Sequence, residues 1–276
     1  LESAVRERMR GASPCRAMAW VPTVIGKMSQ TLAGSAARAR HALAPITPGL
    51  ERTFLVESFD RIVSGRVPED CATGRLSRLI EQDDVRPYQE LKLYGHNAAH
   101  LMLGLVARVR GWSWMTQLRK AGSALEAARA LITQESGAAL RRRWPRAGGE
   151  LASEAALRSF ATELVDRITS PWLNDAVERV IRDLPRKLAR DDRLFGALSV
   201  CDQYGVAAPN LEAAAWGGVA VWSAAMWGRA GTRLDSADIA AALGHLWGVF
   251  EDATLLDRWA SRLVAAQPRW EQWLNG

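Results

Sequence analysis

The chain has only three cysteines in 276 residues, Cys15, Cys71 and Cys201, and they lie far apart. Their spacing supports neither a disulfide framework nor a zinc site, so a reducing compartment, the cytoplasm, is the expected location. The longest apolar run, residues 217–228, is shorter than the roughly 20 residues that cross a bilayer, so no membrane association is expected. The first ten residues are charged and amphipathic, which predicts no signal peptide. Because the first residue is Leu rather than Met, we expect a fragment or a processed product.

Glycine motifs for nucleotide phosphates are missing as well. No G-x-G-x-x-G follows a predicted strand, and no G-x-x-x-x-G-K occurs. The glycine pairs at 148–149 and 217–218 lack a flanking strand, so we interpret them as loop and helix-packing positions. These residues alone therefore predict no dinucleotide site.

The charge balance is only mildly basic. Lys and Arg total 36 against 30 Asp and Glu, which permits an anionic ligand without requiring one. The 12 Trp residues could stack on nucleic-acid bases, but they recur at helical spacing among Ala, Leu and Val, which is typical of core positions. Since no nucleic-acid motif accompanies them, no nucleic-acid partner is expected.

Hydropathy patterns predict a mainly α fold with a short α/β lead-in. Residues 1–10 resemble the end of a helix, 19–28 and 52–63 resemble strands, and 33–50 resembles a loop. From about residue 75 the apolar spacing is helical throughout, with prolines between the segments. The predicted helices cover residues 91–109, 112–119, 124–144, 154–168, 174–184, 191–204, 210–227, 236–250 and 254–274.

The stretch KLYGHNAAH places Lys92, Asn97 and His100 on one predicted helix. In a regular α-helix Asn97 and His100 share a face, while Lys92 lies about 140° from Asn97. His96 falls on another side and is interpreted as a bystander. Spacing alone favours a surface lysine, a solvated amide and a half-buried imidazole. The alternative is a proton-transfer site, because a buried amine can act as a general base while an amide and an imidazole polarise an oxygen.

A second polar stretch, SPWLNDAVERVIRDLPRKLARDDRL, spans residues 170–194. Arg179, Arg182 and Arg186 repeat at intervals of three and four, so one helix face could present cations to a phosphate or carboxylate. Without other information the simpler alternative is favoured. That alternative is a solvated basic face paired with neighbouring acids on the helix, namely Asp175, Glu178 and Asp183.

Taken together, these motifs resemble the polyol-specific long-chain dehydrogenases and reductases, the mannitol dehydrogenase family. Lys-x4-Asn-x2-His matches the family signature, residues 170–194 resemble a segment of its mannitol-1-phosphate 5-dehydrogenases, and TQESGAALRRRW at 133–144 resembles a helix containing Glu-Ser-Gly. All three occur in the family's order and at about its spacings. The resemblance covers roughly residues 20–205.

The resemblance implies an NAD(P)-dependent dehydrogenase of polyols, sugar phosphates or sugar acids. Residues 1–70 would be the tail of an N-terminal Rossmann domain, and 71–276 the helical substrate and catalytic domain. Lys92 would be the general acid/base, so no metal is needed, with Asn97 and His100 on the reacting oxygen. Arg179, Arg182 and Lys187 would bind a small, polyhydroxylated, anionic substrate. NAD or NADP would bind to a domain that this chain does not contain, and nothing in the sequence defines an oligomeric state.

Two departures from the family pattern keep an alternative open. The dinucleotide fingerprint is absent, and the family's Val-Asp-Arg-Ile strand aligns with residues 25–28, so Gly26 replaces the Asp and Lys27 the Arg. The Asp lies near the substrate in the family. The alternative is therefore a non-catalytic helical remnant that binds a sugar phosphate or a protein partner.

Overall fold

The computed structural model describes residues 20–34, 39, 42–45, 47, 49, 52–57, 62–68, 79–173, 175–228, 234–248 and 252–276. The helix end expected in residues 1–10 lies outside these ranges, as do Cys15, Cys71 and much of the loop expected at 33–50. Within the described residues, no helix is long and apolar enough to cross a membrane.

Short strands form two small sheets near the start of the chain. The strands are β1 (Thr23–Ile25), β2 (Ser29–Ala33), β3 (Arg52–Val56), β4 (Ile62–Gly65) and β5 (Leu79–Gln82). In one sheet β4 pairs antiparallel with β1 and parallel with β5, and in the other β2 pairs antiparallel with β3. The strand expected at 19–28 is therefore wrong in extent, because pairing stops after Ile25 and resumes at Ser29 with a new partner. The strand expected at 52–63 is likewise divided between β3 and β4, and β5 was not predicted.

Helices make up most of the rest of the described chain, which confirms the mainly α prediction. A continuous helical segment runs through α3 (Arg86–Glu90), the π-helix η2 (Leu91–Asn97) and α4 (Ala98–Val109). The other helices are η3 (Met115–Lys120), α5 (Gly122–Ala130), the π-helix η4 (Leu131–Ser136), α6 (Gly137–Arg143), η5 (Gly149–Leu151), α7 (Glu154–Ile168), α8 (Val177–Ile181), α9 (Leu184–Lys187), α10 (Phe195–Gln203), α11 (Pro209–Trp227), α12 (Ser236–Trp247) and α13 (Ala253–Asn275).

The segment predicted as one helix at 174–184 is broken, and this prediction is wrong. Arg182 has an extended ψ of 143°, and Asp183 takes a left-handed conformation with φ 58°, which starts α9 in a new direction. The Lys187 amine donates to the Val180 carbonyl at 2.7 Å, which satisfies an acceptor at the end of α8. Arg179 and Arg186 therefore lie on different helices, and the predicted single cationic face does not form.

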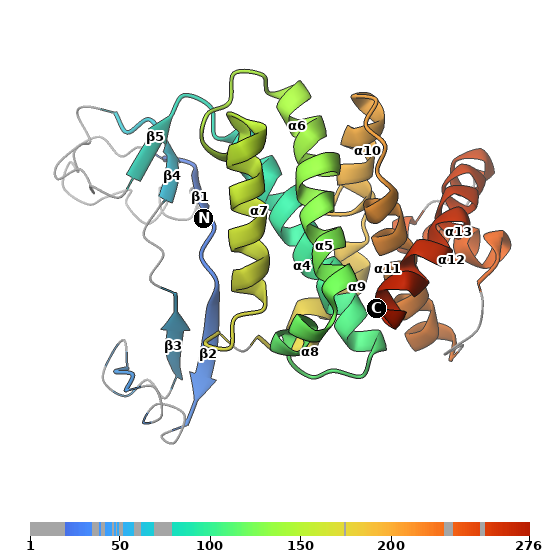
Figure 1. Ribbon diagram of the computed structural model, residues 1–276, viewed down its shortest axis with the longest axis horizontal. Helices are drawn as coiled ribbons and strands as arrows, with labels where there is room; N and C mark the ends of the chain where they lie inside the picture. Colours follow the sequence, from blue (N-terminus) through green and yellow to red (C-terminus); the bar gives the residue numbers. More distant parts are fainter. Residues whose placement is uncertain are drawn as a thin grey trace, which may run out of the picture.

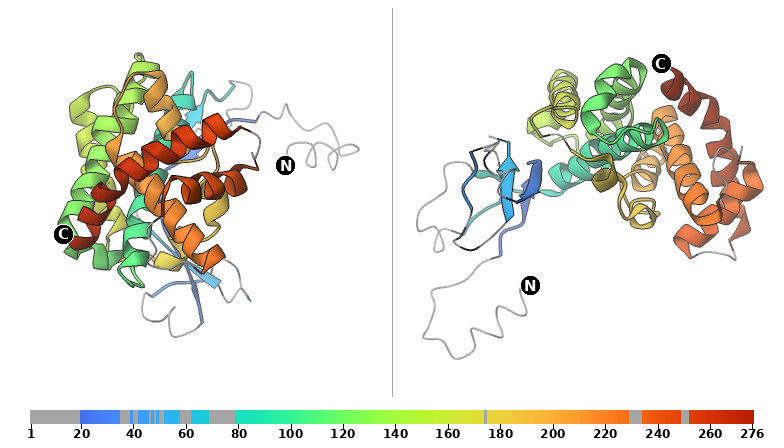
Figure 2. Two further views of the ribbon diagram at one scale, coloured as in Figure 1. Left: turned by 90° about the vertical axis from the view of Figure 1, so that its right-hand side faces the viewer. Right: turned by 90° about the horizontal axis from the view of Figure 1, so that it is seen from below.

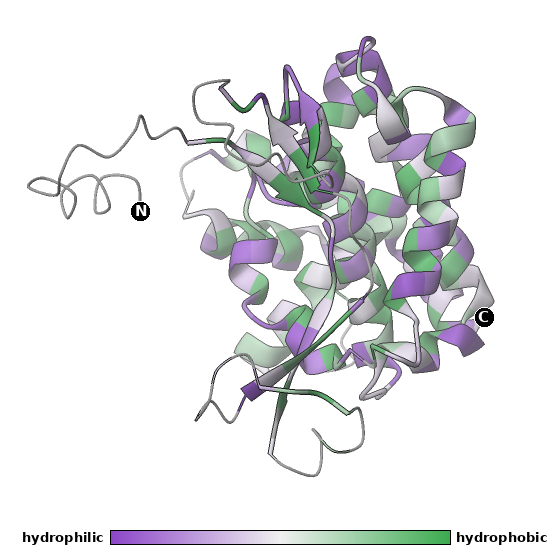
Figure 3. Cartoon of the chain, turned by 90° about the vertical axis from the view of Figure 1, so that its left-hand side faces the viewer, coloured by the Kyte–Doolittle hydropathy of each residue, from purple (hydrophilic) through white to green (hydrophobic). Residues whose placement is uncertain are grey.

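The strands lie along one side of the helical body, with α7 nearest to them, and α11, α12 and α13 lie at the other end (Figures 1 and 2). Helix α4 runs through the core and packs against α5, α8 and α11. Its residues 101–107 are all buried. Figure 3, seen from the strand-bearing side, shows hydrophobic residues along the strands in front of the helices. The residues of the polar motif thus lie at the start of a central helix.

Candidate functional site

The turn that carries Lys92 and Asn97 is wider than an α-helical turn. Both residues belong to η2, where the backbone pairs each residue with the one five positions away. Lys92 and Asn97 are five apart, so this turn brings them nearer to one line along the helix than the predicted 140° separation. The expectation based on 100° per residue is wrong for this reason. Such π turns are frequent at functional sites.

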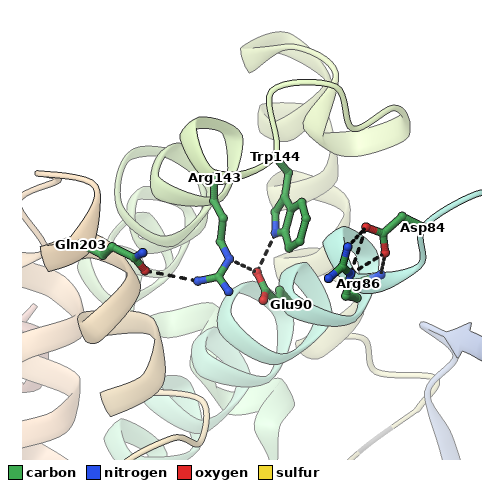
Figure 4. Close-up of polar contacts among 6 residues, drawn as sticks. All are labelled: Asp84, Arg86, Glu90, Arg143, Trp144 and Gln203. Carbon is green, nitrogen blue, oxygen red and sulfur yellow. Dashed lines mark hydrogen bonds and ion pairs between the residues drawn. The ribbon is translucent and has the colours of Figure 1, made fainter.

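Polar contacts from α6 and α10 hold the residue just before this turn (Figure 4). Glu90 accepts a hydrogen bond from the Trp144 indole at 2.7 Å and faces the Arg143 guanidinium at 3.2 Å. Arg143 also bonds Gln203 at 3.4 Å, and Arg86, paired with Asp84, lies over the Trp144 ring. The first turn of the helical segment is therefore tied to two other helices, which fixes where η2 begins.

A small cavity of about 90 Å³ separates η2 from the strands and α7. Lys92 and His96 both border it, while Asn97 and His100 are not among its described lining residues. The full lining is Val24, Gly26, Val63, Tyr88, Leu91, Lys92, His96, Glu150, Phe160, Glu163 and Arg167. Pockets for small molecules usually measure about 300–1,000 Å³, so a sugar-sized ligand would need this cavity to widen.

His96 is not the bystander that spacing suggested. It is buried, borders the cavity beside Lys92, and its ring lies 6.1 Å from that of His100, centroid to centroid. Burial lowers the pKa of His96 well below its ordinary value, and the nearby charges of His100, Arg167 and Lys92 act in the same direction. A neutral imidazole therefore faces the cavity. His96 lies four residues after Lys92, a spacing at which helical side chains share a face, so its position beside Lys92 follows from the helix even though it does not share the face of Asn97.

Arg167 on α7 joins the helical body to the strands and borders this cavity. Its Nε donates to Glu57 Oε2 at 2.9 Å, its Nη2 donates to the Gly26 carbonyl at 2.6 Å, and Glu57 accepts from the Met28 amide at 2.6 Å. Arg167 also borders two neighbouring hollows of about 10 and 440 Å³. The partners are 110 residues apart, so no local sequence signal marks this pair.

His100 faces an acid that α8 brings to it. Nε2 of His100 is shielded from solvent and lies 3.3 Å from Asp175 Oδ2, although the described residues offer this nitrogen no hydrogen bond of good geometry. Arg179 donates two hydrogen bonds to the same carboxylate, from Nε to Oδ1 at 2.6 Å and from Nη2 to Oδ2. Burial alone would raise the pKa of the Asp175 carboxyl, but its interactions with His100 and Arg179 hold the pKa below its ordinary value. The i,i+4 pairing offered as the simpler alternative for Arg179 is therefore formed.

The three residues predicted to bind substrate lie in different settings. Arg179 is half exposed and bonded to Asp175, and Arg182 is exposed at the end of α8. Lys187 is buried, and its pKa is lowered to about 8 by burial, with the charges of Arg193 and Arg186 adding to the effect. Of the three, the structure connects only Arg179 to the predicted catalytic residues, through Asp175.

The described residues do not fit the phosphates of a dinucleotide. Among the described strands, β5 alone runs directly into a helix, and its junction with α3 carries Asp83 and Asp84 instead of glycines. These carboxylates would repel a pyrophosphate, which such sites hold with backbone amides. The described residues also gather no group of three potential His, Cys, Asp or Glu metal ligands.

Comparisons with known proteins place this geometry in context. The mannitol-1-phosphate 5-dehydrogenase of Caldanaerobacter subterraneus subsp. tengcongensis is 30% identical over 129 residues, 47% of this chain and 31% of the relative. That of Brevibacillus brevis is 28% identical over 132 residues, 47% of this chain and 32% of the relative. The chain resembles polyol dehydrogenases. The family resemblance inferred from the motifs is thus confirmed.

The fold agrees with the sequence matches. The structure of Pseudomonas fluorescens mannitol 2-dehydrogenase, in a ternary complex with NAD and D-mannitol, superposes with a TM-score of 0.63 and 16% identity. The match covers 97% of this chain and 53% of that enzyme. The matches thus span about a third of the length of the curated polyol dehydrogenases and about half of the structural neighbour. No family model matches the sequence.

Proposed function

We propose that the chain is the substrate-binding and proton-handling part of a polyol, sugar-phosphate or sugar-acid dehydrogenase. The observation that carries the proposal is the π turn of η2, which carries Lys92 and Asn97 five residues apart and leaves Lys92 on the wall of a cavity. The resemblance to mannitol-1-phosphate 5-dehydrogenases supports it. The division into residues 1–70 and 71–276 stays a prediction; β5, which pairs with β4, lies after that boundary.

In the proposed reaction Lys92 takes the proton from the substrate hydroxyl as the carbon becomes a carbonyl, while the hydride of that carbon would pass to bound NAD(P)⁺. In the reverse direction the carbonyl carbon would receive the hydride, and Lys92 returns the proton to the oxygen. Asn97 donates a hydrogen bond to the reacting oxygen, and His100 orients the substrate. Such polar groups help most where charge develops on that oxygen. Because an amine handles the proton, this half of the reaction needs no metal.

The cofactor and the substrate are assigned by class. The chemistry calls for NAD or NADP, and we propose that another, nucleotide-binding domain holds it, because the described residues offer no cradle for its phosphates. The substrate would be small, polyhydroxylated and anionic, with Arg182, exposed at the end of α8, available to meet its charge. A cytoplasmic location fits these soluble metabolites.

The test uses the full coding sequence, or this chain fused to the nucleotide-binding domain of a relative. NAD(P)H oxidation is followed with fructose, fructose 6-phosphate and hexuronates. We expect Lys92→Ala to lower kcat by about 10²–10⁴-fold, the usual contribution of general acid–base catalysis. The control, Lys120→Ala, removes an exposed lysine of η3 and should leave kcat unchanged. Full activity in Lys92→Ala would contradict the role of Lys92.

A second candidate, a non-catalytic domain that binds a sugar phosphate or a protein partner, is favoured by the small volume of the cavity, about 90 Å³. Calorimetry on the chain with NAD(H) and with sugar phosphates separates the two. Sugar-phosphate binding, together with no turnover by the full coding sequence, would favour the second candidate.

A further inference from the structure

Helices α4 and α8 approach closely beside the predicted catalytic residues. A Cβ atom at Gly104 would lie 2.5 Å from Val180 Cγ1, so only glycine allows α8 to pack this near. Gly104 lies one turn after His100, on the same face of α4. This contact brings the loop before α8, with Asp175, against the imidazole.

The backbone on either side of Asp175 is also fixed. Trp114 and Ala176 form an isolated antiparallel bridge, in which the Met115 amide donates to the Asp175 carbonyl at 2.9 Å and the Val177 amide donates to Ser113 at 3.0 Å. Asp175 is therefore held from three directions: by this bridge, by the packing of α8 on α4, and by the two-point contact with Arg179. A group held in this way can orient its neighbour.

We propose that Asp175, held by Arg179, is a positioning residue that fixes the tautomer of His100, an inference that rests on the proposed function. Nε2 lies 3.3 Å from the carboxylate, although the two groups are not aligned for a good hydrogen bond. Because an ionised carboxylate attracts an N–H group and repels a lone pair, Nε2 carries the proton when the ring is neutral. Nδ1 then has the lone pair. His100 would accept the hydrogen of a substrate hydroxyl through Nδ1, while the Asn97 amide supplies the donor.

This assignment gives Arg179 a task in addition to the substrate contact that its sequence position predicts. Arg179 keeps the Asp175 carboxylate charged and fixes its plane, since a guanidinium binds a carboxylate at two points. Arg179 is then a positioning residue that acts through Asp175. Arg182, beyond the end of the helix, keeps its predicted role towards the substrate.

The experiment is long-range ¹H–¹⁵N NMR of the histidine side chains in the chain as it exists. Spectra are recorded at pH 8.5, where an ordinary imidazole is neutral, and His100→Gln assigns the signals. We expect the Nε2–H tautomer of His100 in the wild type. Asp175→Asn should populate the Nδ1–H form, because an amide can donate to Nε2. Asp183→Asn, the same substitution at an exposed acid paired with Arg186, should leave the tautomer unchanged.

An Nδ1–H tautomer in the wild type would overturn the inference, and so would identical tautomers in the wild type and Asp175→Asn. If Asp175→Asn does not fold, the wild-type spectrum alone decides. The measurement needs no turnover, so its result is separate from that of the dehydrogenase assay. If the chain does not support polyol oxidation, the proposed reaction is wrong, but the tautomer of His100 is unaffected. If His100 is the Nδ1–H tautomer, this inference is wrong, but the role of Lys92 is unaffected.

Discussion

The two π turns, η2 and η4, pack against each other but use their polar residues differently. In η4 the buried Glu135 accepts three hydrogen bonds from the start of α11, from the amides of Asn210 and Leu211 at 2.8 Å and from Asn210 Nδ2 at 2.7 Å. In η2, Lys92 and His96 face a cavity. A π turn therefore marks a place where polar groups are directed inward. Whether they serve the fold or a ligand depends on what they meet there.

The largest expected effect tests the structural role of η4. Glu135→Ala leaves three donors at the start of α11 without their acceptor, so the free energy of unfolding should fall by about 3–5 kcal/mol. Urea unfolding measures it. Glu126→Ala, which removes an exposed acid of α5 that borders the same surface pocket as Glu135, should change the free energy of unfolding by less than about 0.5 kcal/mol. Equal losses in both variants would contradict the distinction between the turns.

The two turns should also respond oppositely to pH. Burial raises the pKa of Glu135 to about 7 from an ordinary 4.5, so the folded chain retains a proton that the unfolded chain has lost between these values. Protonation of Glu135 therefore contributes on the order of 3 kcal/mol to the free energy of unfolding. This contribution is complete below pH 4.5 and is lost as the pH rises to about 7. His96, whose pKa is lowered, destabilises the fold as the pH falls below about 6.5.

Urea unfolding across pH 4.5–7 of Glu135→Gln and His96→Gln separates these contributions. Without Glu135, stability should rise more steeply with pH than in the wild type, because the opposing contribution of His96 remains. Without His96, it should fall more steeply as the pH rises. Parallel pH profiles in all three proteins would show that neither group titrates as its burial implies.

A smaller effect is expected where Arg167 joins the strands to α7 beside the cavity of η2. Arg167→Ala removes the partner of Glu57 and of the Gly26 carbonyl, so the free energy of unfolding should fall by about 2 kcal/mol. Hydrogen exchange at the Met28 amide, which donates to Glu57, should become faster. Arg158→Ala, which breaks only an exposed pair with Glu154, should cost at most about 0.5 kcal/mol. Unchanged exchange at Met28 would contradict the role of Arg167 in holding the strands against α7.

The sequence predicted the helices well and the site only in part. Residues 154–168 match α7 at both ends, because Ser153 is a strong N-terminal cap whose side chain accepts from Ala156 and the apolar spacing is regular. The π turn could not be predicted, because spacing arguments assume 3.6 residues per turn. The break at Asp183 depends on a left-handed backbone that few residues other than glycine adopt.

Long-range pairs were equally inaccessible from the sequence. His100 meets Asp175 only because α8 folds back onto α4, and Arg167 meets Glu57 only because the strands pack on α7. The predicted residues Lys92, Asn97 and His100 were identified by a motif, whereas His96 and Asp175 depend on tertiary contacts. A sequence motif thus identifies only some of the residues that lie together at this site.

The close approach at Gly104 has an evolutionary consequence. Because a single methyl group at position 104 would collide with Val180, the sizes of these two residues cannot drift independently. In homologous chains a larger residue at the first position should coincide with a smaller one at the second, and pairs that vary together in this way mark spatial contact. The distance between α4 and α8 thus limits the combined side-chain volume at positions 104 and 180.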